Sequence, residues 1–364
     1  MRYGVVLAAG KGTRMRSDRP KPLVEVCGLS MVGHVLAALG DLDDLSRIVV
    51  VVGHEAEAVE AEVQRHAPSG VEVVTAYQFD QRGTGDAVRV ALTRLPDLLP
   101  GVGSSGAEVV VVPSDAPLLT ATSLRALLAT HAAQGNAATV LTMELDDPSG
   151  YGRILRARDG KVRAIVEQAD LDDDRGEATR EVNTGVYVFD LAVLPSALRL
   201  LAPTNRQREY YLTDSIALLA ESGYRVGTLV LDDPTEALGV NDRLQLADVA
   251  ERMRARIVRR LLHEGVQIQH PSTVTVDARV RVAEGVVIEP QVALLGATRI
   301  EANALIGAHS RLVDTVVGQG AQLRAVDACC ATIGEWATVG PFSVLETGAV
   351  VEPKGTVPPF ARLP

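Results

Sequence analysis

The sequence predicts an α/β domain with a Rossmann-like sheet, followed by a short left-handed parallel β-helix. Short apolar runs alternate with amphipathic stretches over residues 1–240, which is the pattern of a sheet covered by helices. A glycine-rich loop follows the first apolar run. Over residues 266–364, aliphatic side chains recur every six positions, as they do in a parallel β-helix.

The strands of the first domain are predicted from its apolar runs. These lie at residues 4–9, 48–53, 71–76, 109–112, 138–143, 162–167 and 186–189. Apolar residues have the spacing of amphipathic helices at residues 35–42, 56–66, 85–95 and 123–134. Strands that alternate with helices favour a mostly parallel sheet with helices on both faces. Ligands of such sheets bind beyond the carboxyl ends of the strands, where residues 10–14 would lie.

The six-residue repeat predicts the β-helix. Its register breaks near residues 317–330, and the aliphatic positions are Val276, Val282, Ile288, Leu294, Ile300, Ile306, Leu312, Ile333, Val339, Leu345, Val351 and Val357. Each repeat would form one face of a coil, with the aliphatic side chain inside. Glycines that suit the corners occur at positions 285, 296, 307, 318, 334, 340 and 348. Left-handed β-helices commonly associate in threes, so a homotrimer is expected.

A helix is expected to join the two domains. Residues 1–240 would form the α/β domain, residues 241–265 this helix, and residues 266–364 the β-helix. Asn241 is a good N-cap residue. One apolar stripe of the helix consists of Leu244, Leu246, Val249, Met253, Ile257 and Leu261.

The loop after the first strand has the features of a phosphate-binding loop. Gly10 and Gly12 have no Cβ, so their backbone N–H groups can approach a polyanion closely. Lys11, Arg14 and Lys21 add positive charge. The loop lacks the third glycine of the dinucleotide-binding motif and the Gly-Lys-Ser/Thr ending of the P-loop. On the glycines alone, an ordinary turn between a strand and a helix is an equal alternative.

Two other expected strands are followed by polar residues. Gln78 precedes Gly83 and Thr84 at the start of a helix, where amide and N–H groups can contact a base or a phosphate. Taken alone, this segment is more often a plain helix entry. Asp115 follows the strand at residues 109–112, and a carboxylate there suits Mg²⁺, which prefers oxygen ligands. A cap for the next segment is the alternative.

Composition narrows the function classes. The chain has 364 residues, 47% of them hydrophobic and 23% charged, as expected of a globular protein with a sizeable core. Its net charge of −10 argues against nucleic acid as a partner. The three cysteines have neither metal-ligand spacing nor an even disulfide framework, so reduced thiols and a cytoplasmic location are expected. No signal peptide or membrane span is expected.

The order of these motifs resembles the bacterial bifunctional N-acetylglucosamine-1-phosphate uridylyltransferase/glucosamine-1-phosphate acetyltransferase family, over roughly residues 1–345. Residues 7–21 read Leu-x-x-Gly-x-Gly-Thr-x-Met-x4-Pro-Lys, a signature of sugar-nucleotide pyrophosphorylases. Further matches are Gln78 and residues 83–85, 115–118, 150–153, 166–167, 181–185, 209–214 and 239–241. The resemblance implies Mg²⁺-dependent transfer of UMP from UTP to a sugar 1-phosphate, with N-acetylglucosamine 1-phosphate as the expected acceptor.

The resemblance also implies roles for individual residues. Arg14 and Lys21 would be catalytic, with Lys11 and Arg14 on the β- and γ-phosphates and Lys21 on the reacting phosphates. Asp115 and Asn241 would hold Mg²⁺. Gln78 and the Gly83 backbone would contact uracil, within a nucleotide-binding set that consists of Leu7, Ala8, Ala9, Gly10, Lys11, Gly12, Gln78, Gly83 and Thr84. The implied sugar-binding residues are Gly152, Glu167, Asn183, Tyr211 and Thr213.

Several positions depart from the family pattern. Pro113 and Ser114 add bulk before Asp115, and Arg208 stands where the family has a smaller or neutral residue. The family's second half continues for more coils that carry the acetyl-transfer histidine and the coenzyme A groove, and Glu346 replaces an arginine there. Acetyltransferase activity is therefore not expected.

Other functions remain as alternatives at this point. The same chemistry could act on another hexose or cyclitol 1-phosphate, or use dTTP or another nucleotide. A protein of another class, a non-catalytic regulator that binds nucleotide sugars, would have lost catalysis through Pro113 and Ser114. A hexapeptide acyltransferase would need coenzyme A-binding residues, for which the sequence shows no candidates.

Overall fold

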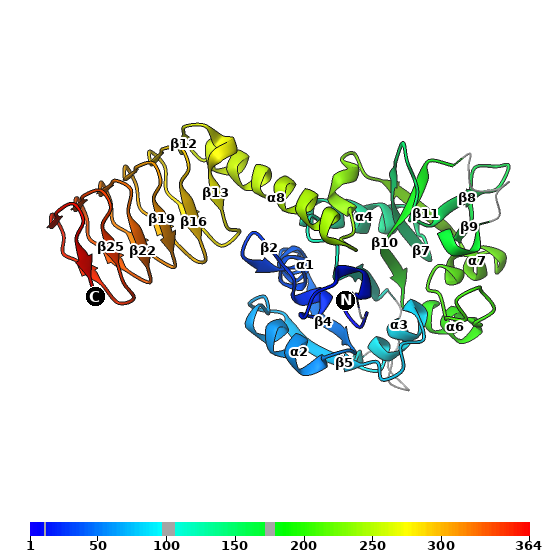
Figure 1. The fold of residues 1–364 in the computed structure, drawn as a ribbon. Helices are drawn as coiled ribbons and strands as arrows, with labels where there is room; N and C mark the ends of the chain where they lie inside the picture. Colours follow the sequence, from blue (N-terminus) through cyan, green and yellow to red (C-terminus); the bar gives the residue numbers. More distant parts are fainter. Residues whose placement is uncertain (11, 97–105, 172–178) are drawn as a thin grey trace. The chain divides into compact units, whose positions relative to one another are not determined.

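The computed structural model describes residues 1–10, 12–96, 106–171 and 179–364. The chain forms two compact units, one of Met1–Val24 with Ser30–Leu246 and one of Glu25–Leu29 with Ala247–Pro364. The first unit holds a sheet with helices and the second a β-helix (Figure 1). Among the described residues, no helix is both long enough and apolar enough to cross a membrane.

The first unit is built on one twisted sheet. Its strand order is β11 (Val226–Val230), β7 (Ala138–Glu144), β10 (Glu181–Asp190), β6 (Glu108–Pro113), β1 (Arg2–Leu7), β4 (Leu45–Val52) and β5 (Glu72–Tyr77). Strand β10 runs antiparallel to β6 and β7, while the other neighbours in this order are parallel. The antiparallel hairpin of β8 (Arg153–Arg156) and β9 (Val162–Val166) joins the sheet beside β10.

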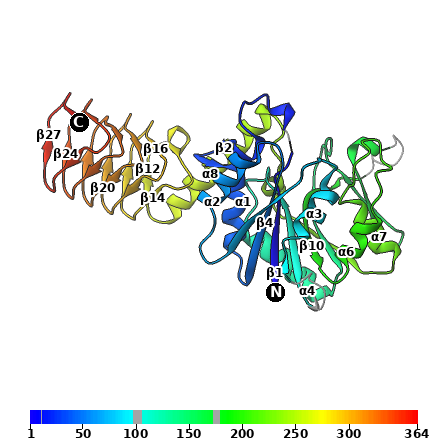
Figure 2. The same ribbon diagram turned by 90° about the horizontal axis from the view of Figure 1, so that it is seen from below.

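Helices cover both faces of this sheet (Figure 2). Successive side chains of a strand point to opposite faces, so Val109 and Val111 enter one buried cluster and Val110 and Val112 the other. The first cluster includes residues of α3 (Thr84–Leu92), α6 (Leu194–Leu200) and α7 (Asp214–Glu221). The second includes residues of α1 (Met31–Gly40), α2 (Ala56–Arg65) and α4 (Ala121–Gln134). The predicted α/β class is therefore confirmed.

All four predicted helices of this unit form, and the largest shift is at α1. This helix begins at Met31 rather than at position 35, because the Ser30 side chain accepts a hydrogen bond from the Gly33 N–H and caps it. No sequence pattern indicated β8, β11 or α6, whereas a further helix, expected to begin at Asp214, forms as α7. The sequence analysis also missed the short hairpin of β2 (Glu25–Val26) and β3 (Leu29–Ser30).

The second unit is a left-handed parallel β-helix of three sheets, as predicted. One sheet consists of β12 (Gln267–Ile268), β15 (Val287–Ile288), β18 (Leu305–Ile306), β21 (Gln322–Leu323), β24 (Thr338–Val339) and β27 (Thr356–Val357). The next consists of β13 (Thr275–Val276), β16 (Ala293–Leu295), β19 (Arg311–Val313), β22 (Asp327–Cys329), β25 (Val344–Leu345) and β28 (Arg362–Leu363). The third consists of β14 (Arg281–Val282), β17 (Arg299–Ile300), β20 (Val316–Val317), β23 (Thr332–Ile333) and β26 (Val350–Val351).

The break in the repeat is a local shortening of the coils. The predicted inward residues are buried, and Val317, Leu323 and Ala328 continue the buried column across the break. Arg281 pairs with Arg299, whereas Val316 pairs with Thr332 after a shorter coil. The shortened corners contain residues with positive φ, such as Ala325 at 47°, so the chain turns within fewer residues.

Helix α8 (Arg243–His263) lies between the repeat and the sheet in the sequence. Its buried residues include Val249, Met253, Ile257 and Leu261, as predicted. Leu244 is 82% exposed, so the prediction that it belongs to the apolar stripe is wrong. The cap also differs from the prediction, because the Asp242 carboxylate accepts the Gln245 N–H at 2.8 Å. Asn241 therefore does not cap the helix, and its side chain lies elsewhere.

Candidate active site

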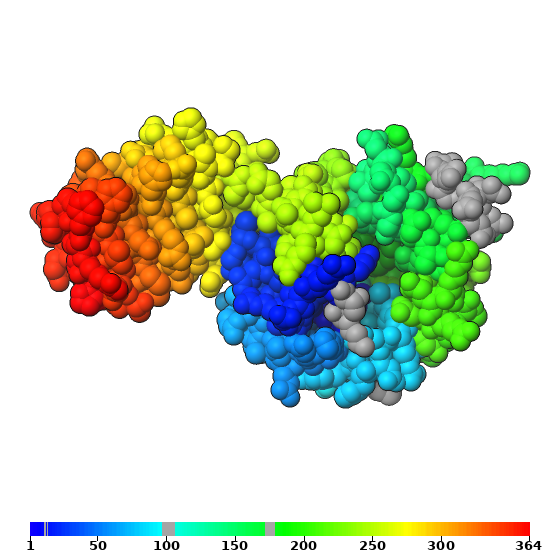
Figure 3. Space-filling view, in the orientation of Figure 1, coloured from blue at the N-terminus to red at the C-terminus, as the bar shows by residue number. Residues whose placement is uncertain are grey.

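A cavity of about 410 Å³ lies at the carboxyl ends of β1 and β6. In the space-filling view a hollow opens between the blue, cyan and green segments of this unit (Figure 3). The residues that line the cavity are Leu7, Ala9, Gly10, Lys21, Pro22, Gln78, Gln81, Gly83, Thr84, Ala87, Pro113, Ser114, Asp115 and Glu209. The position agrees with the rule that ligands of α/β sheets bind beyond the carboxyl ends of strands.

Lys21 is the central cation of this cavity. It begins the 3₁₀ helix η2 (Lys21–Leu23), and its Nζ donates to the Asp115 carboxylate and, at 3.0 Å, to the amide oxygen of Asn241. Arg14, in the 3₁₀ helix η1 (Thr13–Met15), donates from Nη2 to the same Asn241 oxygen at 3.0 Å. The structure thus brings together four residues from three distant parts of the sequence.

Gly12 allows Lys21 to approach the loop. Its φ is +59°, and a Cβ at this position would lie 2.5 Å from the Cβ of Lys21. Both the backbone conformation and the space require glycine. Among the other loop residues, Leu7, Ala9 and Gly10 line the cavity, whereas Ala8 is buried. The predicted phosphate contact of Lys11 lies outside the described residues.

Two residues that the sequence analysis missed hold this loop. Arg243 donates from Nε to the Met15 carbonyl at 3.1 Å and from Nη2 to the Arg16 carbonyl at 3.2 Å. Gln81 donates from Nε2 to the Ala9 carbonyl at 2.7 Å and lines the cavity. No local motif marks Arg243, since its partners lie at the other end of the domain sequence. Gln81 stands between Gln78 and Gly83. Its place inside this predicted base-binding segment could have indicated that it lies at the site.

The predicted base-binding segment forms another wall of the cavity. Gln78 is 4% exposed, and its Nε2 donates to the Gly83 carbonyl at 3.1 Å and to Asp86 at 2.9 Å. Because both amide hydrogens are engaged, the amide oxygen is the atom of Gln78 suited to meet a ligand donor. The Thr84 hydroxyl accepts the Leu212 N–H at 3.0 Å, so Thr84 also has a structural role.

The five predicted sugar-binding residues lie close together beyond this wall. Thr213 donates to the Glu167 carboxylate at 3.1 Å, and a Cβ on Gly152 would lie 3.3 Å from the other Glu167 oxygen. The Asn183 N–H donates to the Gly152 carbonyl at 2.9 Å, where the register of β10 is irregular. The charge of Glu167 also raises the pKa of Tyr211, after the larger effects of burial and of Asp170.

Backbone hydrogen bonds join the base-binding segment to the sugar-binding segment. The Gly85 N–H donates to the Tyr210 carbonyl, and the Tyr210 N–H donates to the Arg82 carbonyl, both at 2.7 Å. A Cβ on Gly83 would lie 2.6 Å from the Tyr210 carbonyl oxygen. A nucleotide at Gly83 and a sugar at Tyr211 would therefore contact two chain segments that are fixed against each other.

Burial perturbs the acidic groups of this region. It raises the pKa of Glu167, an effect that the Thr213 hydrogen bond opposes and that the nearby carboxylates Asp214 and Asp170 increase. Burial also raises the pKa of Glu209, which lines the cavity. Carboxyl groups whose pKa is raised in this way are common at functional sites.

Arg153, next to Gly152, is a buried cation that the sequence analysis did not assign. Its side chain donates to the Tyr151 carbonyl and, at 3.1 Å, to the Gln168 amide oxygen. Its Nε has no hydrogen-bond partner among the described residues, although Arg153 is only 5% exposed. Arg153 therefore fixes the loop that presents Gly152.

The donor set at Lys21 fits a hard divalent cation. Asp115 and Asn241 offer a carboxylate oxygen and an amide oxygen, and both already bind one cation, the Lys21 ammonium. Mg²⁺ takes oxygen ligands and usually keeps several waters or substrate phosphates, so two protein ligands are enough. Among the described residues there is no cluster of three or more His, Cys, Asp or Glu side chains that could hold a metal.

The residues that depart from the family pattern are accommodated. Pro113 pairs with Leu7 at the end of β6, and the Ser114 N–H donates to the Leu7 carbonyl at 3.1 Å. Arg208 has a φ of 57° and an exposed side chain, and it does not line the cavity. In the β-helix, Glu346 forms an ion pair with Arg362 of the next coil.

Comparison with known proteins assigns the family. A family model described as nucleotidyl transferase matches residues 3–242. The bifunctional protein GlmU of Streptomyces avermitilis is 44% identical over 354 residues, which are 97% of this chain and 71% of that protein. GlmU of Thermobifida fusca is 45% identical over 93% of this chain and 67% of that protein. GlmU of Mycobacterium tuberculosis is 42% identical over 99% of this chain and 71% of that protein.

A solved structure supports the fold alone. The crystal structure of HddC from Yersinia pseudotuberculosis matches with a TM-score of 0.51 and 18% identity, over 70% of this chain and 100% of that chain. The GlmU proteins match both units of this chain at a much higher identity. The chain therefore belongs to the nucleotidyl transferase family and, within it, to the GlmU uridylyltransferases.

Proposed function

We propose that this uridylyltransferase transfers UMP from UTP to N-acetylglucosamine 1-phosphate, with Mg²⁺ as its cofactor. The observation that supports this proposal most is the position of the Lys21 ammonium between Asp115 and Asn241, where Lys21 and Asp115 line the cavity. A cation and two hard oxygen ligands at one point are what two reacting phosphates and a divalent metal need.

The reaction needs alignment and charge compensation rather than a general base. An oxygen of the sugar 1-phosphate attacks the α-phosphorus of UTP in line, and pyrophosphate leaves with the bonding electron pair. Near neutral pH the attacking phosphate is already ionised, so no side chain has to remove a proton. Lys21 and Arg14 would offset the charge of the two anions, and the Gly10 backbone would lie against the phosphates.

Asp115 and Asn241 would hold Mg²⁺ in place of the Lys21 ammonium. The metal would act as a Lewis acid on the phosphate oxygens. Once Asp115 and Asn241 bind the metal, Lys21 would be free to contact the phosphates of the substrate. In the ligand-free structure, Lys21 donates hydrogen bonds to both of the oxygen atoms that would bind the metal. The proposed exchange of Lys21 for the metal would explain this arrangement.

The remaining residues would select the substrates. The amide oxygen of Gln78 suits the imide N–H of uracil, a donor that thymine shares. The sugar hydroxyl groups would donate to the Glu167 carboxylate, beside Thr213 and the Asn183 backbone. The protein groups around the hexose would distinguish it from other sugars by hydrogen bonds. A sugar that lacks one of the hydroxyl groups would leave a buried protein group unpaired, which costs binding free energy.

The test is pyrophosphate release with Mg²⁺, measured over a matrix of nucleotides and acceptors. UTP and dTTP are each paired with N-acetylglucosamine 1-phosphate, glucose 1-phosphate and a cyclitol 1-phosphate. We expect the highest kcat/KM with UTP and N-acetylglucosamine 1-phosphate. A higher kcat/KM for another pair would reassign the substrate, and no release with any pair would favour the non-catalytic regulator.

We further infer that the β-helix makes the protein a homotrimer. Phe342 and Phe360 are 63% and 77% exposed, and their rings stack with centroids 5.3 Å apart. Both have positive φ, 63° and 62°, which is uncommon for bulky residues and costs free energy. An exposed aromatic pair on strained corners of adjacent coils is a candidate interface between copies.

Light scattering after size exclusion tests this inference. The wild type should have three times the mass of one chain, and Phe342→Ser/Phe360→Ser should dissociate. The control is Leu200→Ser, which changes a side chain that is 64% exposed in the first unit. A monomeric wild type would contradict the trimer, and a trimeric double variant would place the interface elsewhere on the β-helix.

A further inference from the structure

A second depression, of about 890 Å³, lies apart from the cavity at Lys21 and shares none of its lining residues. The turn between β8 and β9 forms one side of it, and β11 and the end of α7 form the others. The substrates proposed above do not need this depression.

Its lining carries more positive than negative charge, and part of the positive charge is unpaired. Arg156, Lys161, Arg163 and Arg225 line it, against the two carboxylates Asp159 and Glu221. Lys161 is paired with Asp159 at 2.9 Å. Arg163 and Arg225 form no ion pair with a described residue. In a chain with a net charge of −10, a concave surface with two free guanidinium groups is suited to an anion.

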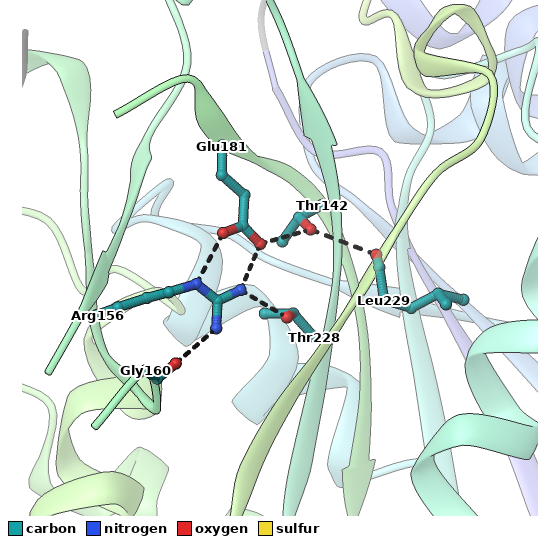
Figure 4. A network of polar contacts seen from close by, with 6 residues as sticks. All are labelled: Thr142, Arg156, Gly160, Glu181, Thr228 and Leu229. Carbon is teal, nitrogen blue, oxygen red and sulfur yellow. Dashed lines mark hydrogen bonds and ion pairs between the residues drawn. The ribbon is translucent and has the colours of Figure 1, made fainter. Parts of the chain in front are cut away.

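Arg156, which lines the depression, is held by a network of polar contacts (Figure 4). Its guanidinium group donates to both oxygens of Glu181, at 2.9 and 2.7 Å, and Thr142 donates to the same carboxylate at 2.9 Å. It also donates to the Gly160 carbonyl and to the Thr228 hydroxyl, each at 2.9 Å. Arg156 thus ties the β8–β9 turn to β11, and the surrounding groups are positioned before any ligand arrives.

The backbone carbonyl groups at the end of α7 are occupied, although the helix ends at the exposed carboxylate of Glu221. A helix C-terminus is normally negative because of its free carbonyl groups. Here the carbonyls of Leu218, Leu219 and Ala220 accept the N–H groups of Ser222, Tyr224 and Gly223. The Tyr224 ring is 49% exposed and lines the depression, so it can stack on a planar group.

The depression is also connected to the sugar-binding residues. Strand β8 begins directly after Gly152, and β9 ends directly before Glu167. At the other end of this short hairpin lie Arg156, the last residue of β8, and Lys161, in the turn before β9. A ligand that moves the turn therefore acts on a two-stranded element whose opposite end holds the candidate sugar contacts.

We propose that this depression is a regulatory site for a small metabolite with two phosphate groups, and that its occupancy changes the affinity for the sugar 1-phosphate. One phosphate would bind Arg163 and Arg225, and the second would replace Asp159 as the partner of the exposed Lys161 ammonium. The regulatory part of this inference rests on the proposed function, whereas anion binding does not.

Isothermal titration with fructose 1,6-bisphosphate tests the binding. The titration is made on a Lys21→Ala background, which weakens anion binding in the other cavity. Arg163→Ala/Arg225→Ala should weaken the affinity by about tenfold or more, because charged hydrogen bonds are lost. The control Arg158→Ala/Arg324→Ala removes equal charge at residues outside the depression and should leave the affinity within about twofold. Equal affinities for the two double variants would overturn the site.

A second probe identifies the source of the phosphates. Adenosine 3′,5′-bisphosphate should bind more tightly than the sugar bisphosphate if the ligand is a nucleotide, and Tyr224→Ala should remove that advantage. A tighter sugar bisphosphate, unaffected by Tyr224→Ala, would assign a phosphorylated sugar. Binding of neither probe to the Lys21→Ala protein would overturn the proposal.

Kinetics test the coupling separately. In the otherwise wild-type enzyme, the probe that binds should change the KM for the sugar 1-phosphate, and Arg163→Ala/Arg225→Ala should remove this effect. Binding without a change in KM would keep the site and overturn its regulatory role. If pyrophosphate release were absent with every substrate pair, the proposed function would fail, whereas the binding result would still stand.

Discussion

Lys21 and Asp115 form an ion pair in the lining of the cavity, in the first unit of the chain. Their side chains are 14% and 23% exposed. An ion pair with so little solvent exposure holds both groups in place. In the ligand-free protein each charge therefore stabilises the other. In the proposed reaction Lys21 would contact the substrate phosphates and Asp115 would bind the metal.

Asp115→Asn should lower kcat by about a hundredfold or more, because it would remove the charged ligand that we propose for the metal. Binding of Mn²⁺ in the presence of UTP, followed by electron paramagnetic resonance, should weaken in parallel. The control is Asp327→Asn, an exposed substitution in the β-helix, which should change neither quantity. Unchanged Mn²⁺ affinity in Asp115→Asn would show that the metal lies elsewhere.

Asn241 and Asp242 are neighbours with separate roles, and two substitutions should distinguish them. Asp242→Ala removes the cap of α8 and should lower stability by about 1 kcal/mol, with little change in kcat. Asn241→Ala removes the oxygen that Lys21 and Arg14 share and should lower kcat with a smaller loss of stability. Thermal unfolding and steady-state kinetics of both variants provide the measurement. A larger loss of stability in Asn241→Ala than in Asp242→Ala would show that Asn241 caps the helix.

Gly12→Ala should abolish most of the turnover. The added Cβ would lie 2.5 Å from the Lys21 Cβ, so Lys21 must move away from Asp115. Gly70→Ala is the matched control, since Gly70 has a φ of +84° and nothing lies within 4 Å of a Cβ there. Both variants should lose about 1–2 kcal/mol of stability from the backbone conformation. Equal turnover in the two variants would show that Lys21 tolerates the displacement.

The sequence predicted the fold well where one pattern persists over many residues. The buried column of the β-helix follows from its six-residue repeat, and the alternation of apolar runs with helices predicted the sheet. The shortened coils were visible only as a break, because Val317, Leu323 and Ala328 keep the column through corners one residue shorter. Such corners depend on left-handed backbone conformations at residues that do not usually favour them.

The site was harder to predict where a role depends on distant partners. The glycine loop, Asp115 and Gln78 each end a predicted strand, so topology places them at one edge. Arg243 could not be found in this way, because its partners are carbonyl groups at residues 15 and 16. For Asn241, the local rule for helix caps favoured a plausible but wrong role, since Asp242 follows it and caps the helix.

Glu167→Gln tests whether the buried carboxylate at the candidate sugar site lowers the stability of the ligand-free protein while it contributes to sugar binding. Burial raises the pKa of Glu167, so the folded protein holds this proton at a pH where the unfolded chain, with a pKa of about 4.3, has lost it. The folded state is thus favoured at low pH, and that stabilisation is lost as the pH rises through the folded pKa.

Glutamine can accept the Thr213 hydrogen bond and does not titrate. The ligand-free variant should therefore be more stable than the wild type near pH 7, with the difference vanishing below pH of about 4.3. Its KM for the sugar 1-phosphate should rise. The measurement is thermal unfolding of both proteins over this pH range. A variant that is less stable than the wild type at every pH would contradict this prediction.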